Sequence, residues 1–199
     1  MFAAQLRVDG PYGSSSEDVF GFRTIVCVGA GIGVTPFASI LRSIQLQHRL
    51  RCSVAGGGGD AQVDPPPKVH FYWVCRSLEE FNAFKCLLLD IVGQKDLAEH
   101  FVFNTYATGQ VDLKKVASHV VSGASNYNQF TGRPNWAAEL KKIGAAHAGE
   151  QIGVFMCGPP PIAAQLRAAC KSCSQKSKQQ FRAGKASART KFIFHKENF

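Results

Sequence analysis

The segment Thr24–Pro36 decides the fold, and it reads TIVCVGAGIGVTP. Its first part, Thr24–Gly29, is a continuous apolar run, which is typical of a strand buried on both faces of a parallel sheet. Glycines follow, and then apolar residues recur at helical spacing from Pro36 to Gln47. The segment therefore predicts a strand, a tight glycine turn and a helix in direct succession.

The rest of the 199 residues repeats this alternation of short apolar runs and helical patterns. Further strands are predicted at Val69–Cys75, Phe101–Ala107, Gln151–Cys157 and Lys191–His195. Further helices are predicted at Leu78–Leu89, Asp112–Val120, Asn135–Ala146 and Pro161–Cys173. Strands separated by helices indicate an α/β fold with a doubly wound parallel sheet, whose ligands bind at the carboxyl ends of the strands.

Three segments depart from the regular pattern. Residues 55–67 contain four consecutive glycines and three consecutive prolines, and residues 172–190 are rich in Ser, Lys and Gln. We expect both to be mobile insertions, and we expect Ser122–Arg133 to be a long polar loop.

The positive charge of the chain is local. The net charge is +9, and the stretch Arg167–Lys191 holds eight Lys or Arg residues and no acid, which leaves the remainder near +1. This stretch fits a solvated insertion, attraction to an anionic membrane leaflet, or an acidic protein partner. Only Phe181 interleaves with the basic residues, so we expect no nucleic-acid partner. Seven cysteines do not form a disulfide framework, and the apolar runs are too short to span a membrane, so we expect a reducing, intracellular setting.

The glycine turn carries the strongest functional signal. The candidate ligand residues are Gly29, Ala30, Gly31, Ile32, Gly33, Val34, Thr35 and Pro36. Glycines let a ligand approach the backbone, and we expect Thr35 to cap the helix and Pro36 to occupy its first turn. The N–H groups at a helix start favour a phosphate, whereas the alternative is a tight turn that binds nothing.

Two more signals lie where other predicted strands end. Arg76 follows the second strand, where an arginine suits the 2′-phosphate of NADP and an acid would suit NAD. Cys157, Gly158 and Pro159 follow the fourth strand. We expect no covalent catalysis by Cys157, because no partner base is evident, and no metal site.

Six blocks stand in a fixed order along the chain: Val8–Gly13, Val28–Leu41, Tyr72–Arg76, Gly132–Trp136, Ile152–Pro159 and Lys196–Phe199. Together they resemble the NADPH-binding half of the dehydrogenase region of the NADPH oxidases. These are superoxide- or peroxide-generating flavocytochromes of the ferredoxin reductase superfamily. The blocks Gly132–Trp136 and Lys196–Phe199 resemble the oxidases more closely than the related ferric reductases.

The resemblance implies a role for each candidate residue. The turn Gly29–Pro36 would hold the pyrophosphate, Arg76 and Arg133 the 2′-phosphate, and Cys157–Pro159 the nicotinamide. Phe199 would stack on the flavin. Hydride would pass from NADPH to FAD without an acid or base from the protein, and electrons would then pass through haem to oxygen.

The resemblance also implies a division of the chain. Residues 1–20 would be the end of a truncated FAD-binding barrel and a linker, and residues 21–199 the NADPH-binding domain. We therefore expect a soluble fragment that is inactive alone, from a parent protein at the cytoplasmic face of a membrane. Its partners would be the FAD and haem domains and cytosolic regulatory subunits. Two alternatives stay open: a non-catalytic regulatory module, and the NAD(P)-binding domain of a ferric reductase.

Overall fold

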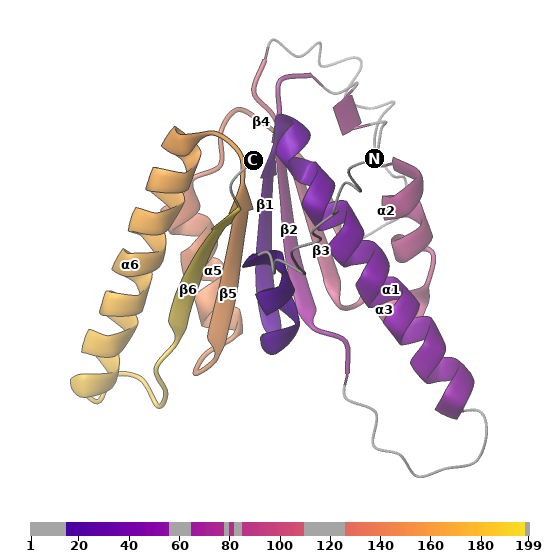
Figure 1. Cartoon of the computed structure of the whole chain (residues 1–199). Coiled ribbons are helices and arrows are strands. Elements are labelled where there is room, and N and C mark those ends of the chain that lie inside the picture. The colour runs from indigo at the N-terminus through magenta and orange to yellow at the C-terminus, as the bar shows by residue number, and fades with distance from the viewer. Residues whose placement is uncertain (1–14, 56–64, 78–79, 82–84, 110–125, 198–199) are drawn as a thin grey trace, which may run out of the picture.

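The molecule is built on one six-stranded sheet in which every neighbouring pair of strands is parallel. The computed structural model describes residues 15–55, 65–77, 80–81, 85–109 and 126–197. The strands are β1 (Thr24–Ala30), β2 (Lys68–Cys75), β3 (Phe101–Ala107), β4 (Tyr127–Thr131), β5 (Gln151–Cys157) and β6 (Lys191–Glu197). Their order in the sheet is β4-β3-β2-β1-β5-β6 (Figure 1). The predicted α/β fold with a parallel sheet is confirmed.

Helices cover both faces of the sheet (Figure 1). One layer contains α1 (Thr35–Ala55), α2 (Lys85–Val92) and α3 (Lys95–Ala98), and the other contains α5 (Trp136–Ala146) and α6 (Pro160–Arg182). Two short 3-10 helices, η1 (Ser15–Gly21) and η2 (Gly31–Val34), flank β1.

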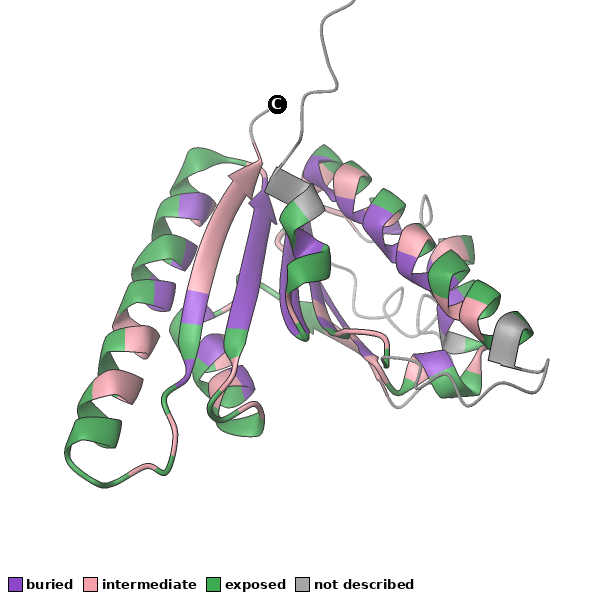
Figure 2. Cartoon of the chain, turned by 60° about the horizontal axis from the view of Figure 1, so that its bottom comes forward, coloured by how far each residue is buried: buried purple, intermediate pink, exposed green. Residues whose placement is uncertain are grey.

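The alternating direction of side chains along a strand explains why β1 is apolar throughout. Ile25 and Cys27 pack in the core on the α1 side, whereas Val26 and Val28 pack in the core on the α5 and α6 side. All seven residues of β1 are buried. Figure 2 shows the buried residues concentrated on the strands and on the inward sides of α1 and α6.

The strand order reverses beside β1. Strands β2, β3 and β4 extend the sheet on one side of β1, and β5 and β6 extend it on the other. Such a reversal leaves a crevice outside the carboxyl ends of the two central strands, and this crevice is where open α/β sheets bind ligands. Here the reversal occurs at the neighbouring strands β1 and β5, and their carboxyl ends mark the expected position.

Two expectations about irregular segments need correction. The helix predicted over Pro161–Cys173 continues to Arg182, so much of the segment 172–190 is helical rather than an irregular insertion. The predicted polar loop Ser122–Arg133 contains the edge strand β4. This strand escaped prediction because its five residues are at most half-buried and carry no apolar alternation.

Several other expectations fall largely outside the described residues. They concern the barrel and linker at residues 1–20, of which only η1 is described, and the insertion at 55–67. The helix predicted at Asp112–Val120 also lies outside. Of the helix predicted at Leu78–Leu89, the structure describes the start of α2 from Lys85 onward.

Candidate functional site

The turn after β1 requires glycine at two positions for different reasons. Gly31 has φ +56°, in the left-handed region that only glycine adopts at little cost. At Gly29 the constraint is space, because a Cβ there would lie 2.8 Å from Cα of Val34. The chain thus turns back on itself within η2 and enters α1 directly.

The glycine turn and the segment after β5 are in direct contact. A Cβ on Gly33 would lie 2.8 Å from the carbonyl carbon and 3.0 Å from Sγ of Cys157, and would overlap the carbonyl oxygen. Gly158 has φ +150°, and a Cβ there would lie 2.7 Å from Cβ of Ala30. Two predicted motifs from distant parts of the chain therefore form one surface at the reversal of strand order.

The side chains around the turn support its shape. Nε1 of Trp73 donates a hydrogen bond to the carbonyl oxygen of Gly31 at 3.3 Å. The prediction that Thr35 caps the helix is wrong, because its φ of −54° and ψ of −48° are helical. Its hydroxyl instead donates to the carbonyl oxygen of Ile32 at 2.9 Å. Ile32 itself is 92% exposed, so the turn presents an apolar side chain to solvent.

The backbone around Arg76 is held from two sides, while its side chain is exposed. The N–H groups of Arg76 and Ser77 each donate to Oε1 of Glu80 at 3.2 Å, so this carboxylate is already engaged. The N–H of Gly109 donates to the carbonyl oxygen of Arg76 at 2.9 Å, and a Cβ on Gly109 would overlap that oxygen. The Arg76 guanidinium forms no ion pair with a described residue.

The block Gly132–Trp136 contains residues with structural roles and Arg133, a candidate to contact a ligand. Gly132 has φ +87°, Asn135 caps α5 by accepting a bond from the N–H of Ala138 at 3.1 Å, and Trp136 is buried. Arg133 is exposed. Gly132, Asn135 and Trp136 thus have roles in the turn, the cap and the core.

Arg76 and Arg133 lie at one edge of the sheet. Cys75 is in register with Ala107, and Ala107 with Thr131, so β2, β3 and β4 end at the same level. Neighbouring strands are about 4.8 Å apart, which places β2 and β4 about 10 Å apart. The backbone positions of Arg76 and Arg133 therefore follow strands that end at the same edge of the sheet.

Cys157 is buried at 3% exposure. Burial above all, and then the nearby Glu197 carboxylate, raise the pKa of its thiol. The thiol is therefore neutral at pH 7, and this favours a packing role over a nucleophilic one.

Other site chemistry is sparse in the described part of the chain. Across residues 15–55, 65–77, 80–81, 85–109 and 126–197, no three His, Cys, Asp or Glu side chains are grouped as a metal site. Within those same ranges, no helix combines the length and hydropathy of a membrane span. The candidate Phe199 lies outside the described residues, although Glu197 in β6 is in register with Cys157.

The family of the chain follows from comparison with known proteins. A model of the ferric reductase NAD binding domain matches residues 22–171. The chain belongs to this family. NADPH oxidase 1 of Rattus norvegicus is 35% identical over 211 residues, covering 98% of this chain and 33% of the oxidase. NADPH oxidase 3 of Homo sapiens is 36% identical over 178 residues, covering 83% of this chain and 29% of that oxidase.

A more distant relative extends the comparison beyond animals. A superoxide-generating NADPH oxidase heavy chain of Dictyostelium discoideum is 34% identical over 172 residues, covering 81% of this chain and 31% of the relative. The resemblance to the NADPH oxidases is confirmed. The chain spans about a third of the length of these curated relatives.

The candidate site of this chain also involves residues that were not among the candidates chosen from the sequence. Gly109 packs on the Arg76 carbonyl, and Trp73 bonds to the glycine turn. Gly109 stands alone in a loop and carries no pattern, whereas Trp73 lies within a quoted block. The close approach of Gly33 to Cys157 depends on strand order, which spacing along the chain does not reveal.

Proposed function

We propose that this chain is the NADPH-binding portion of a membrane NADPH oxidase. In that role it presents NADPH to FAD for hydride transfer, and electrons pass through haem to oxygen to give superoxide or peroxide. The observation that carries the proposal is the packing of Gly33 on Cys157 at the reversal of strand order, with two exposed arginines at the same edge.

The residues of the site fit a dinucleotide. Glycines at the turn leave room for a pyrophosphate against the backbone, and the start of a helix attracts its charge. Arg76 and Arg133 form charge-assisted hydrogen bonds to the 2′-phosphate. Glu80 does not compete for the ribose, because it already accepts two backbone N–H groups.

The nicotinamide end of the site lies over Cys157, Gly158 and Pro159. NADPH supplies the hydride when it is bound, and the protein orients the ring and excludes water. The neutral, buried Cys157 thiol is a wall of this site rather than a reacting group. Phe199 comes two residues after the end of β6 in the sequence, and in this proposal it stacks on the flavin.

FAD, haem and regulatory subunits belong to the proposed parent protein at the cytoplasmic face of a membrane. The curated relatives are named as NADPH oxidases, and this favours an oxidase over a ferric reductase. The same comparison favours part of an enzyme over a non-catalytic regulatory module.

Calorimetric titration with NADPH and with NADH tests the proposal. We expect NADPH to bind more tightly, and Arg76→Ala to weaken NADPH binding about ten- to a hundredfold while leaving NADH unchanged. Arg182→Ala is the matched control, because Arg182 is an exposed arginine in the last turn of α6. This helix starts where β5 ends, so its last turn lies at the opposite edge of the sheet.

Two results would contradict the proposal. Equal binding of NADPH and NADH to the unmodified chain would show that the arginines do not recognise the 2′-phosphate. Absence of binding by either nucleotide to a chain that melts cooperatively would show that these residues do not form a site by themselves.

A further inference from the structure

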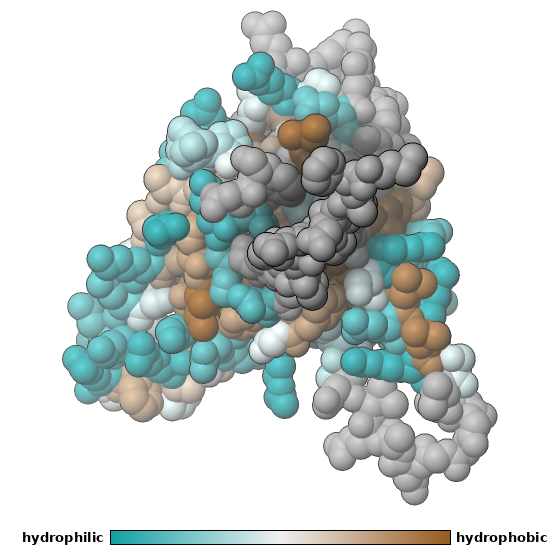
Figure 3. Space-filling view, viewed as in Figure 1, coloured by the Kyte–Doolittle hydropathy of each residue, from teal (hydrophilic) through white to brown (hydrophobic). Residues whose placement is uncertain are grey.

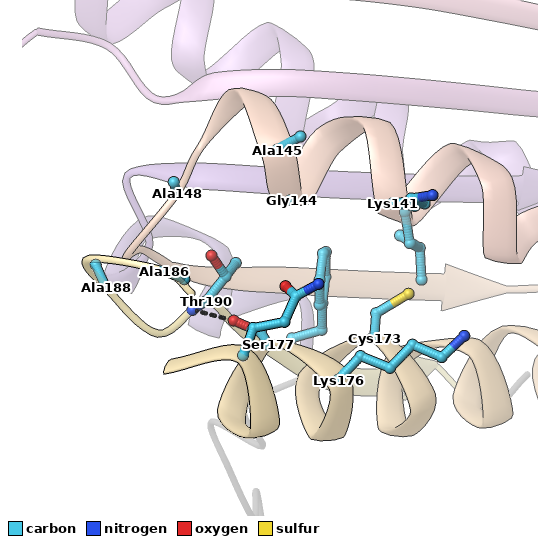
Figure 4. A pocket seen from close by; sticks show the side chains of 13 residues that line it. Lys141, Gly144, Ala145, Ala148, Cys173, Lys176, Ser177, Ala186, Ala188 and Thr190 are labelled. Atoms are coloured by element: carbon cyan, nitrogen blue, oxygen red, sulfur yellow. Dashed lines mark hydrogen bonds between the residues drawn. The ribbon is translucent and has the colours of Figure 1, made fainter. Parts of the chain in front are cut away.

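A second concave site lies between α5, α6 and the start of β6 (Figure 4). The groove has a volume of about 470 Å³. Its floor consists of Leu140 and Phe192, which are buried in the core on this face of the sheet. The Cys173 side chain points into the groove from α6, and Lys141 and Lys176 line it from the two helices (Figure 4).

The groove lies at the edge of the sheet opposite the glycine turn. Ala148 and Thr190 line it, and these residues come shortly before β5 and β6 begin. The contact between Gly33 and Cys157 lies where β1 and β5 end. A ligand in the groove and a nucleotide at the carboxyl edge therefore do not compete for space.

The polar side chains of the groove are two hydroxyl groups that are already bonded, two cationic lysines and the exposed, uncharged amide of Gln180. Ser177 Oγ accepts a bond from the N–H of Thr190 at 2.8 Å, and Thr190 Oγ1 accepts one from the N–H of Gly149 at 3.0 Å. Among the described residues, none that lines the groove is acidic. Lys141 and Lys176 are exposed, and neither ammonium forms an ion pair with a described residue.

We propose that this groove binds a small amphipathic anion, with its apolar body on Leu140 and Phe192 and its acidic head at the rim, where Lys141 and Lys176 supply positive charge. The volume falls within the range of about 300–1,000 Å³ that is usual for small-molecule sites. The outer surface of α6 adds Lys171, Lys178 and Arg182, and is hydrophilic in Figure 3. These cations attract an anion to the groove. The recessed floor suits a single molecule better than a flat membrane surface.

A pair of fluorescent probes tests both halves of this chemistry. The first is 8-anilinonaphthalene-1-sulfonate, and the second is N-phenyl-1-naphthylamine, which has the same rings without the sulfonate. We expect the sulfonate to bind the folded chain with one site per molecule and more tightly than the uncharged amine. Saturating NADPH is expected to leave its affinity unchanged, because the nucleotide site lies at the other edge.

Two neighbouring alanines locate the bound probe. Ala145 lines the groove and is exposed, so Ala145→Trp fills the groove without disturbing the core. Ala146 is also exposed but does not line the groove, and Ala146→Trp is therefore the control. We expect at least a tenfold loss of sulfonate affinity in the first variant and none in the second.

Lysine variants test the acidic head. Lys141→Gln and Lys176→Gln are each expected to raise the Kd of the sulfonate about two- to fivefold and to leave the amine unchanged. Lys95→Gln removes a charge from an exposed lysine of α3, in the helical layer on the other face of the sheet, and serves as the control. Melting temperatures of all variants show that they remain folded.

Three outcomes would overturn the proposal. Equal binding in the two alanine variants would place the probe elsewhere on the molecule. Equal affinity for both probes, with no effect of the lysine variants, would show an apolar patch without anion selectivity. Displacement of the sulfonate by NADPH would assign the probe to the nucleotide edge. The proposed nucleotide site would survive the first two outcomes, because it is tested by NADPH titration alone.

Discussion

Replacing Gly33 by alanine is the sharpest test of the contact between the glycine turn and the end of β5. The added Cβ would lie 2.8 Å from the carbonyl carbon and 3.0 Å from Sγ of Cys157, where ordinary contacts begin near 3.4 Å. Backbone atoms must therefore separate by roughly 0.5–1 Å. Overpacking of this kind costs about 1–3 kcal/mol. At about 2 kcal/mol the melting temperature falls by about 4–8 °C.

The same displacement moves the backbone that we propose binds the phosphates. We expect Gly33→Ala to weaken NADPH and NADH binding together by at least about tenfold, since an error of about 1 Å is costly in a preorganised site. Calorimetric melting and nucleotide titration of one protein preparation measure both effects.

Two other glycines separate the effect of steric overlap from the effect of backbone conformation. Gly31 has φ +56° and nothing within 4 Å of an added Cβ, so Gly31→Ala costs only the conformational term of about 1–2 kcal/mol. Gly21 has neither constraint, and Gly21→Ala is expected to stay within about 0.5 kcal/mol of the parent. A Gly33→Ala variant that melts and binds like Gly21→Ala would refute the contact.

Two further predictions concern His70 and Gly109. Burial above all, and then the electrostatic effects of His147 and Lys68, which outweigh the opposing effect of the Glu139 carboxylate, lower the pKa of His70 from 6.5 to about 4. Between pH 6.5 and 4 the His70 imidazole therefore binds a proton in the unfolded chain but stays neutral in the folded chain. The free energy of unfolding falls as pH drops from about 6.5 toward 4. We expect His70→Gln to remove at most about 3 kcal/mol of this pH-dependent loss in the free energy of unfolding. Urea unfolding at several pH values measures the effect. An unchanged pH profile would contradict the assignment of the loss to His70. The Cβ of Gly109→Ala would overlap the carbonyl oxygen of Arg76 and displace it. We therefore expect the Kd of NADPH to rise while that of NADH stays constant. An unchanged preference for NADPH would show that Arg76 tolerates the shift.

The central strands were predictable because each is buried on both faces. Phe101–Ala107 and Gln151–Cys157 begin and end where the sequence places them, since water-free surroundings on both sides demand an almost continuous apolar run. The edge strand β4 reads Tyr-Asn-Gln-Phe-Thr and lacks that signal. Its five residues are intermediate or exposed, so no continuous apolar run marks it as a strand.

The length of α6 was underestimated for a related reason. Its last turns pack fewer apolar residues, and its polar residues suggested an irregular segment. The hydroxyl groups of Ser174 and Ser177 instead accept the N–H groups of Phe192 and Thr190, which fasten these turns to the start of β6. Such bonds join residues remote in sequence, so no local pattern predicts them.

The places in the fold of several candidate residues were predictable from the sequence, but their packing against one another was not. Glycine spacing predicted the turn, and the ends of strands predicted Arg76 and Cys157. The packing of Gly33 on Cys157, and of Gly109 on Arg76, became evident only from the strand order. Glycine at these positions is required by a neighbour across the molecule rather than by its own backbone.

The seating of Gly33 on Cys157 also sets a time at which the site becomes complete during protein synthesis. A ribosome releases β1 and the glycine turn long before β5, and chains of this length commonly fold through intermediates. The turn has no carbonyl to rest on until β5 has joined β1, so early intermediates present its backbone amides without their final support. Capture of the dinucleotide by a nascent chain would thus report that the second half of the sheet has docked onto the first.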